Sequence, residues 1–197
     1  MLLICEFGGR LTMFGSKEFI LNALKGKDSL AQDSILDASD EYENLCEDHQ
    51  FILDYFKAKT SGNRLASRRD LIPRELISIL PYISLLNIVT DKDGELLDME
   101  FRLVGTSLVN LYGEWTGRKV QSDNSETSLK KTYPDTYKRL IDMASGVLQH
   151  RRAVMTSSQQ MSEDRSYLKI TNISIPLSSN GTDIDIIFVH SDIQKVP

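Results

Sequence analysis

The chain has 197 residues, of which 41% are hydrophobic and 26% charged, and its formal net charge is −5. This length suits one domain with an extension, and the composition excludes a wholly disordered chain. The negative charge gives no general attraction to phosphate backbones, and the short clusters around Arg68 and Arg151 are too small to reverse it, so we expect no nucleic-acid partner.

Residues 1–63 are expected to form an N-terminal segment and a helical extension. Residues 14–38 have a weak helical pattern, and a clearer helix is predicted from Asp40 to Lys59. Its apolar positions recur in steps of three and four, the spacing of a coiled-coil seam. The seam, a candidate homodimer interface, consists of Tyr42, Leu45, His49, Ile52 and Phe56. A second apolar strip, Phe51 and Tyr55, lies beside it. A helix packed wholly on its own domain fits this pattern equally well.

A break at residues 60–63 places the domain boundary there, so that residues 64–197 form the main domain. A short helix is predicted from Pro73 to Leu80, with the proline in its first turn. The β-branched run 82–90 and the alternating run 97–104 predict two strands, and the turn residues 91–94 join them as a hairpin.

Residues 99–120 form the most informative stretch, in which a strand passes into a short helix. The break comes at Gly105, after which Thr106 or Ser107 could cap the helix. Four large side chains recur at helical spacing and share one face: Leu108, Leu111, Tyr112 and Trp115.

The remaining elements are one long helix and three strands. The helix is predicted over 134–148 and the strands over 151–161, 167–177 and 183–191, the last two joined by Asn180-Gly181, a hairpin signal. Strands grouped apart from helices predict an α+β fold: a five-stranded antiparallel sheet covered on one face by helices, with the N-terminal helical extension before it.

Several short pieces of the chain resemble the PAS-domain superfamily, and in particular the stand-alone single-PAS-domain proteins found mainly in alphaproteobacteria. The pieces are Arg68-x-Asp70-x-x-Pro73, Leu80-Pro81, Phe101-Arg-Leu-Val-Gly-Thr106, Gly113-x-x-Thr-Gly117 and Ile175-Pro-Leu-Ser178. The resemblance implies a sensory or signalling protein without its own output domain, which acts in trans on a signalling partner.

A ligand pocket is expected between the helices and the sheet. The candidate lining residues are Arg102 as a polar anchor, with Tyr112, Trp115, Tyr137, Met143 and Met155. The alternative is that these side chains simply fill the core, since aromatic residues at helical spacing are most often core residues. In that case Arg102 points outward or pairs with Asp70.

No enzyme and no cofactor are expected. A flavin photosensor of this superfamily needs a cysteine in the helix after the central strand, and both Cys5 and Cys46 lie upstream. His150 is the best-placed haem ligand, but its position beside two arginines is typical of a helix end. The chain has no nucleophile elbow, phosphate loop or paired-histidine metal motif.

A cytoplasmic location is expected, because two distant cysteines suggest no disulfide framework and no apolar run reaches the length of a membrane span. Met13 is an alternative start. Two functions stay open: a sensor that binds a small molecule or a protein partner, and a constitutive dimeric adaptor with a filled PAS-like core.

Overall fold

The computed structural model describes residues 34–158 and 168–195. The helices are α2 (Glu47–Thr60), α3 (Thr106–Tyr112), α4 (Leu129–Thr132) and α5 (Pro134–His150). The strands are β1 (Ser34–Asp37), β2 (Ile83–Thr90), β3 (Leu96–Val104), β4 (Val154–Ser158), β5 (Leu168–Leu177) and β6 (Ile186–Lys195). Short 3-10 turns lie at Tyr42–Asn44, Arg68–Asp70, Pro73–Glu75 and Leu80–Tyr82.

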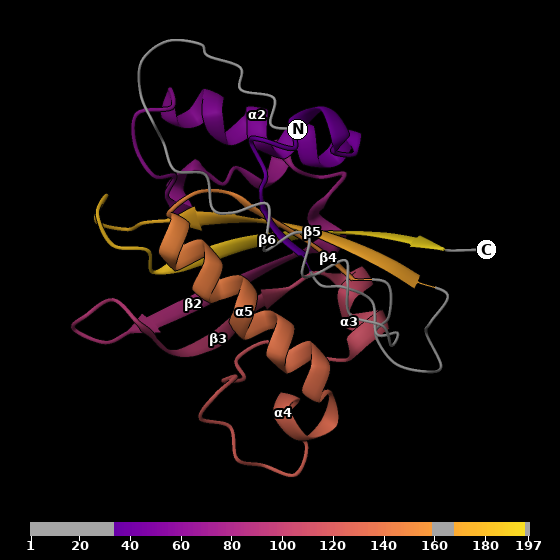
Figure 1. Cartoon of the computed structure of the whole chain (residues 1–197). Helices are drawn as coiled ribbons and strands as arrows, with labels where there is room; N and C mark the ends of the chain where they lie inside the picture. The colour runs from indigo at the N-terminus through magenta and orange to yellow at the C-terminus, as the bar shows by residue number, and fades with distance from the viewer. Residues whose placement is uncertain (1–33, 159–167, 196–197) are drawn as a thin grey trace, which may run out of the picture.

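All described strands form one antiparallel sheet in the order β1-β4-β5-β6-β2-β3 (Figure 1). The five strands from β4 to β3 in this order are the predicted sheet, and the α+β fold is confirmed. The strand β1 adds a sixth, edge position through pairing with β4. The prediction of helix over 14–38 is therefore wrong at Ser34–Asp37, and its earlier part lies outside the described residues.

The sheet has a hydrophobic core on each face, because its buried strands are apolar on both sides. In β6, Ile186 and Phe188 pack toward α2, whereas Ile187 and Val189 pack toward α5. Figure 1 shows α2 above the sheet and α5 lying across its other side, with α3 and α4 nearby. The predicted helical layer is thus α3 to α5, and the N-terminal extension covers the second face.

The helix α2 is shorter than predicted, because the chain is extended at Leu45 and Cys46 and the helix begins only at Glu47. Acidic residues in its first turn and Lys57 and Lys59 in its last suit the helix dipole. The helix ends at Ser61, which has a left-handed φ of 53°, so the predicted break is confirmed.

The predicted seam is mostly buried inside this chain. Leu45, Ile52 and Phe56 belong to the core between α2 and the sheet, and His49 is fully buried. Tyr42 lies outside α2, in the preceding 3-10 turn, and its hydroxyl donates to Asp54. In this arrangement the seam packs on its own domain. A dimer contact through these five residues stays a prediction.

The predicted helix from Pro73 to Leu80 is wrong. Its residues form the separate 3-10 turns Pro73–Glu75 and Leu80–Tyr82. Pro81 lies within the second of these turns, and a proline has no amide hydrogen with which to continue an α-helix.

The hairpin β2–β3 and the helix α5 are confirmed. The strand β4 begins three residues later than predicted, because Arg151 ends α5 in a left-handed conformation with φ of 53°. The last two strands are joined by a longer loop than a two-residue turn, Ser178 to Asp185, within which the Asn180 side chain accepts the amides of Thr182 and Asp183.

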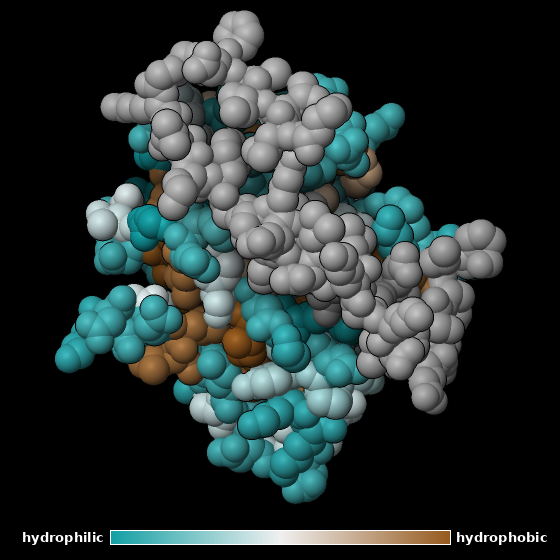
Figure 2. Space-filling view, viewed as in Figure 1, coloured by the Kyte–Doolittle hydropathy of each residue, from teal (hydrophilic) through white to brown (hydrophobic). Residues whose placement is uncertain are grey.

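Figure 2 shows a largely hydrophilic surface over α4 and a hydrophobic surface beside the β2–β3 hairpin turn. Val89 of β2 and Leu97 of β3 are half-exposed. In the part of the chain that the structure describes, no helix is long and apolar enough to cross a membrane.

Candidate functional site

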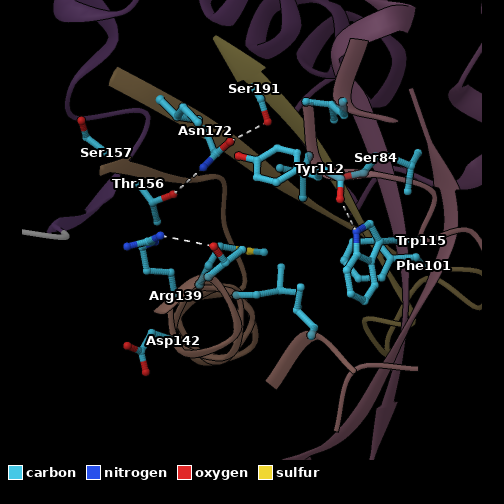
Figure 3. Close-up of a pocket in the computed structure, with 18 residues that line it drawn as sticks. Ser84, Phe101, Tyr112, Trp115, Arg139, Asp142, Thr156, Ser157, Asn172 and Ser191 are labelled. Atoms are coloured by element: carbon cyan, nitrogen blue, oxygen red, sulfur yellow. Dashed lines mark hydrogen bonds between the residues drawn. The ribbon is translucent and has the colours of Figure 1, made fainter. Parts of the chain in front are cut away.

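A cavity of about 180 Å³ lies between the α5 face of the sheet and the helices α3, α4 and α5. Each strand from β2 to β6 and each of these helices contributes lining residues. The cavity therefore occupies the position that the sequence predicted, under the helices and against the sheet. Figure 3 shows its lining side chains.

One side of the cavity is aromatic and rigidly built. Trp115 is 6% exposed, and its indole nitrogen donates to the backbone oxygen of Tyr112 over 2.9 Å. Its ring contacts Phe101 and Tyr133 at centroid distances of 6.2 and 6.4 Å. Each of these contacts comes from a different element, so the indole is held in one orientation at the end of α3.

The Arg118 guanidinium lies over the indole ring of Trp115, with its central carbon 4.3 Å from the ring centroid. The same guanidinium donates to Asp123 and to the backbone oxygen of Thr127 at 2.7 Å each. Hydrogen bonds from Ser125, together with Arg118, lower the pKa of Asp123 to about 2. The loop between α3 and α4 is thereby anchored to the aromatic wall of the cavity.

The opposite side of the cavity is polar. Thr156, Asn172 and Ser191 are neighbours in register on β4, β5 and β6. The Ser191 hydroxyl donates to the Asn172 side-chain oxygen over 2.7 Å, and the Asn172 amide nitrogen lies 3.4 Å from the Thr156 hydroxyl. Figure 3 shows the three side chains in a row, away from Trp115 and Phe101. We call this row the polar strip.

The helix α5 supplies both apolar and charged lining residues. Leu140 and Met143 are apolar, whereas Arg139 donates to the Thr136 hydroxyl over 3.3 Å and Asp142 pairs with Lys138. The lining therefore carries one charge of each sign, which favours a neutral or zwitterionic occupant over a strongly charged one.

Three of the six predicted pocket residues line the cavity: Tyr112, Trp115 and Met143. Arg102, Tyr137 and Met155 do not. Arg102 is exposed on β3, because the period of two sends its neighbour Phe101 inward instead.

Tyr137 is half-buried beside the core, with the Lys130 ammonium 5.8 Å from its ring centroid. Met155 packs on the α2 side of the sheet, since the next residue, Thr156, takes the cavity side.

Sequence reasoning missed the polar strip. Each member lies in a strand that also carries other polar residues, such as Ser157 beside Thr156 and Thr171 beside Asn172, so nothing local distinguishes it from a solvent-facing position. Only the strand register brings the three side chains together on the cavity face.

Neither histidine nor cysteine is among the residues that line the cavity. Within residues 34–158 and 168–195, no group of three or more histidine, cysteine or acidic side chains is placed to hold a metal ion.

Comparison with known proteins gives one match. A family model described as a PAS domain matches residues 47–188, which include α2, the strands β2 to β5, the start of β6 and the whole cavity lining apart from Val189 and Ser191. A search of curated proteins gave no match, and a search of solved structures gave none.

Proposed function

Because this chain belongs to the PAS-domain family, we propose that it is a sensory protein whose cavity binds one small molecule and whose extension α2 passes the response to a signalling partner. The family implies a sensory or signalling role. We also propose that the protein acts in trans on its partner in the cytoplasm, and that it is one of the stand-alone PAS proteins found mainly in alphaproteobacteria.

The observation that supports ligand binding is the cavity itself. An engineered apolar cavity of about 150 Å³ in another protein takes up benzene, so a space of about 180 Å³ suits a molecule of about one ring or an equivalent short chain. A constitutive adaptor with a filled core has no need of this space.

The lining favours one chemical class of ligand. Trp115, Phe101 and Met143 offer apolar contacts, and the polar strip offers hydroxyl and amide groups at the other side. We therefore expect a small neutral amphipathic molecule, with its apolar part against Trp115 and a hydrogen-bonding group against Asn172.

The test is native mass spectrometry of the protein purified from its own host, followed by thermal shift with a panel of small neutral ring compounds that carry one hydroxyl or amide group. A retained or stabilising neutral compound supports the proposal. Ile170→Phe, which adds a ring at the cavity, should abolish binding, whereas Val89→Phe, on the half-exposed hairpin, should leave it unchanged.

Two outcomes contradict the proposal. One is a protein from its host without any bound compound and without a thermal shift from any member of the panel. The other is binding that survives Ile170→Phe in a folded variant. Either result favours the adaptor, whose core would be closed by side-chain movement in solution.

A further inference from the structure

The other face of the sheet holds two histidines in direct contact. His49 of α2 is fully buried and His190 of β6 is 1% exposed. Their ring centroids lie 5.1 Å apart, with the rings nearly perpendicular at 88°. One ring belongs to the helix and the other to the sheet, so the pair is formed only when α2 is docked.

These imidazoles lack the hydrogen bonds that buried polar groups normally make. None of the four ring nitrogens makes a well-formed hydrogen bond among the described residues, although the backbone of His190 lies close to the His49 ring. Most buried side-chain nitrogen atoms in proteins are paired, because an unpaired one costs free energy. Aliphatic side chains would fill the same space without that cost, so two histidines here call for an explanation.

We propose that His49 and His190 form a proton-operated latch, which holds α2 on the sheet when both rings are neutral and releases it when either ring is charged. A charged imidazolium in this contact would be buried without an ion pair and would lie against a second ring that is also able to take up a proton. Undocking exposes both rings to water. The latch lies on the opposite face from the cavity and does not depend on ligand binding.

The titratable and charged groups around the pair do not supply a compensating hydrogen bond. They come from the start of α2, from the turn before β2, and from β5 and β6: Cys46, Asp48, Tyr82, Lys169 and Asp192. Burial lowers the pKa of His49, and it outweighs Asp192, Asp48 and the nearby backbone of His190, which all favour the charged form. Burial, together with the neighbouring His49, lowers the pKa of His190 to about 3.

The direction of the pH effect follows from these shifts. A histidine whose pKa is lower in the docked state stabilises docking fully above its ordinary pKa of about 6.5, and this contribution falls as the pH drops below that value. Between pH 7.5 and 5.5 the equilibrium constant for undocking should rise about tenfold through His190, and by up to about tenfold more through His49.

A groove beside the pair provides a route for protons. It is lined by His49 together with residues of β4, β5 and β6, among them Lys169 and Asp192. A small opening at the start of α2 would therefore bring His49 into contact with water before the rest of the helix leaves the sheet.

The test is amide hydrogen exchange on the full-length chain at pH 7.5 and 5.5, corrected for the intrinsic pH dependence of exchange. Opening of the central turns of α2 should increase tenfold to a hundredfold at the lower pH, whereas opening of α5 should change less than threefold. Equal increases in both helices would indicate global unfolding and would overturn the latch, as would unchanged exchange in α2.

The matched variants are His49→Leu with His190→Leu, and His150→Leu as the control at the exposed end of α5. The double variant should lose the pH response of α2, and the control should keep it. Histidine NMR titration of the unmodified protein needs no variant: two rings should remain neutral at pH 5.5 while α2 is docked. Titration of all three near 6.5, with α2 still protected from exchange, would overturn the proposal.

Discussion

His190 and Ser191 are consecutive residues of β6 whose side chains lie on opposite faces of the sheet. His190 contacts His49 of α2, and Ser191 donates to Asn172 in the cavity. The same strand therefore carries the contact with the extension and one end of the polar strip. A displacement of β6 would move side chains on both faces of the sheet, because His190 and Ser191 share one backbone.

Among the residues of the cavity wall, Trp115 is expected to contribute most to the stability of the fold. Trp115→Ala should destabilise the protein by about 3–5 kcal/mol, because it removes a buried indole and its contacts with Phe101, Tyr133 and Arg118. Urea unfolding gives the measurement. A loss below about 1 kcal/mol, as at surface sites, would contradict the burial of this ring.

The helix α2 offers a matched pair of neighbouring residues, Phe51 and Ile52. Ile52 is fully buried against the sheet, so Ile52→Asp should cost about 4 kcal/mol or more through the lost packing and the buried charge. Phe51 is 41% exposed, and Phe51→Asp should change the stability by less than about 1 kcal/mol.

Sedimentation of the same two variants examines the predicted homodimer. A dimer formed through the outer side of α2 should dissociate in Phe51→Asp without loss of folding. A chain that stays monomeric at every concentration, in wild type and variant, would end the dimer prediction.

Gly105 is held against the backbone of the turn before β2. Its amide donates to the Ile83 oxygen over 2.7 Å, and a Cβ atom here would overlap the carbonyl oxygens of Leu80 and Pro81. Gly105→Ala should therefore destabilise by about 1–3 kcal/mol and displace α3. Thermal unfolding measures the loss, with the exposed Thr106→Ala as control; equal stability of the two variants would contradict this close approach.

Asp70 lies in the segment between α2 and β2, and its carboxylate accepts several hydrogen bonds. Both its oxygens accept from Arg64 at 2.8 Å, and one also accepts the amide and hydroxyl of Ser67. The Arg64 guanidinium and these bonds hold the pKa of Asp70 well below its usual range. Asp70→Asn should cost about 1–3 kcal/mol at pH 7.

The pH dependence of this loss follows from the lowered pKa of Asp70. Its contribution is complete above the unfolded pKa of about 3.9 and disappears as the pH falls below it, so the difference between Asp70→Asn and wild type should shrink below pH 4. Asp93→Asn, at an exposed turn carboxylate, is the control. A difference that stays constant from pH 7 to pH 2.5 would contradict the ion pair.

The purified protein is expected to show no visible absorbance. The cavity lining contains neither the thiol of a flavin photosensor nor a histidine for haem, and His150 is exposed at the end of α5. The measurement is an absorption spectrum of protein from its own host. A Soret band that disappears in His150→Ala would refute this expectation.

Local patterns in the sequence were sufficient for most of the secondary structure. The apolar spacing of α5, the alternation in β3 and the turn residues between β2 and β3 each act over a few residues, so they could be interpreted without the fold. The same patterns placed Tyr112, Trp115 and Met143 at the cavity. They failed for Met155, where an error of one residue reverses the face of a strand.

What the sequence by itself determined was the α+β class and the apolar side of the cavity, because these depend on periodicity within single elements. The family came from the resemblance of short motifs to PAS domains. Only the tertiary structure decided the polar strip, the added strand β1 and the pair of His49 with His190. Each of these depends on which residues of distant segments meet, and that is set by strand register and by the docking of α2 rather than by any local pattern.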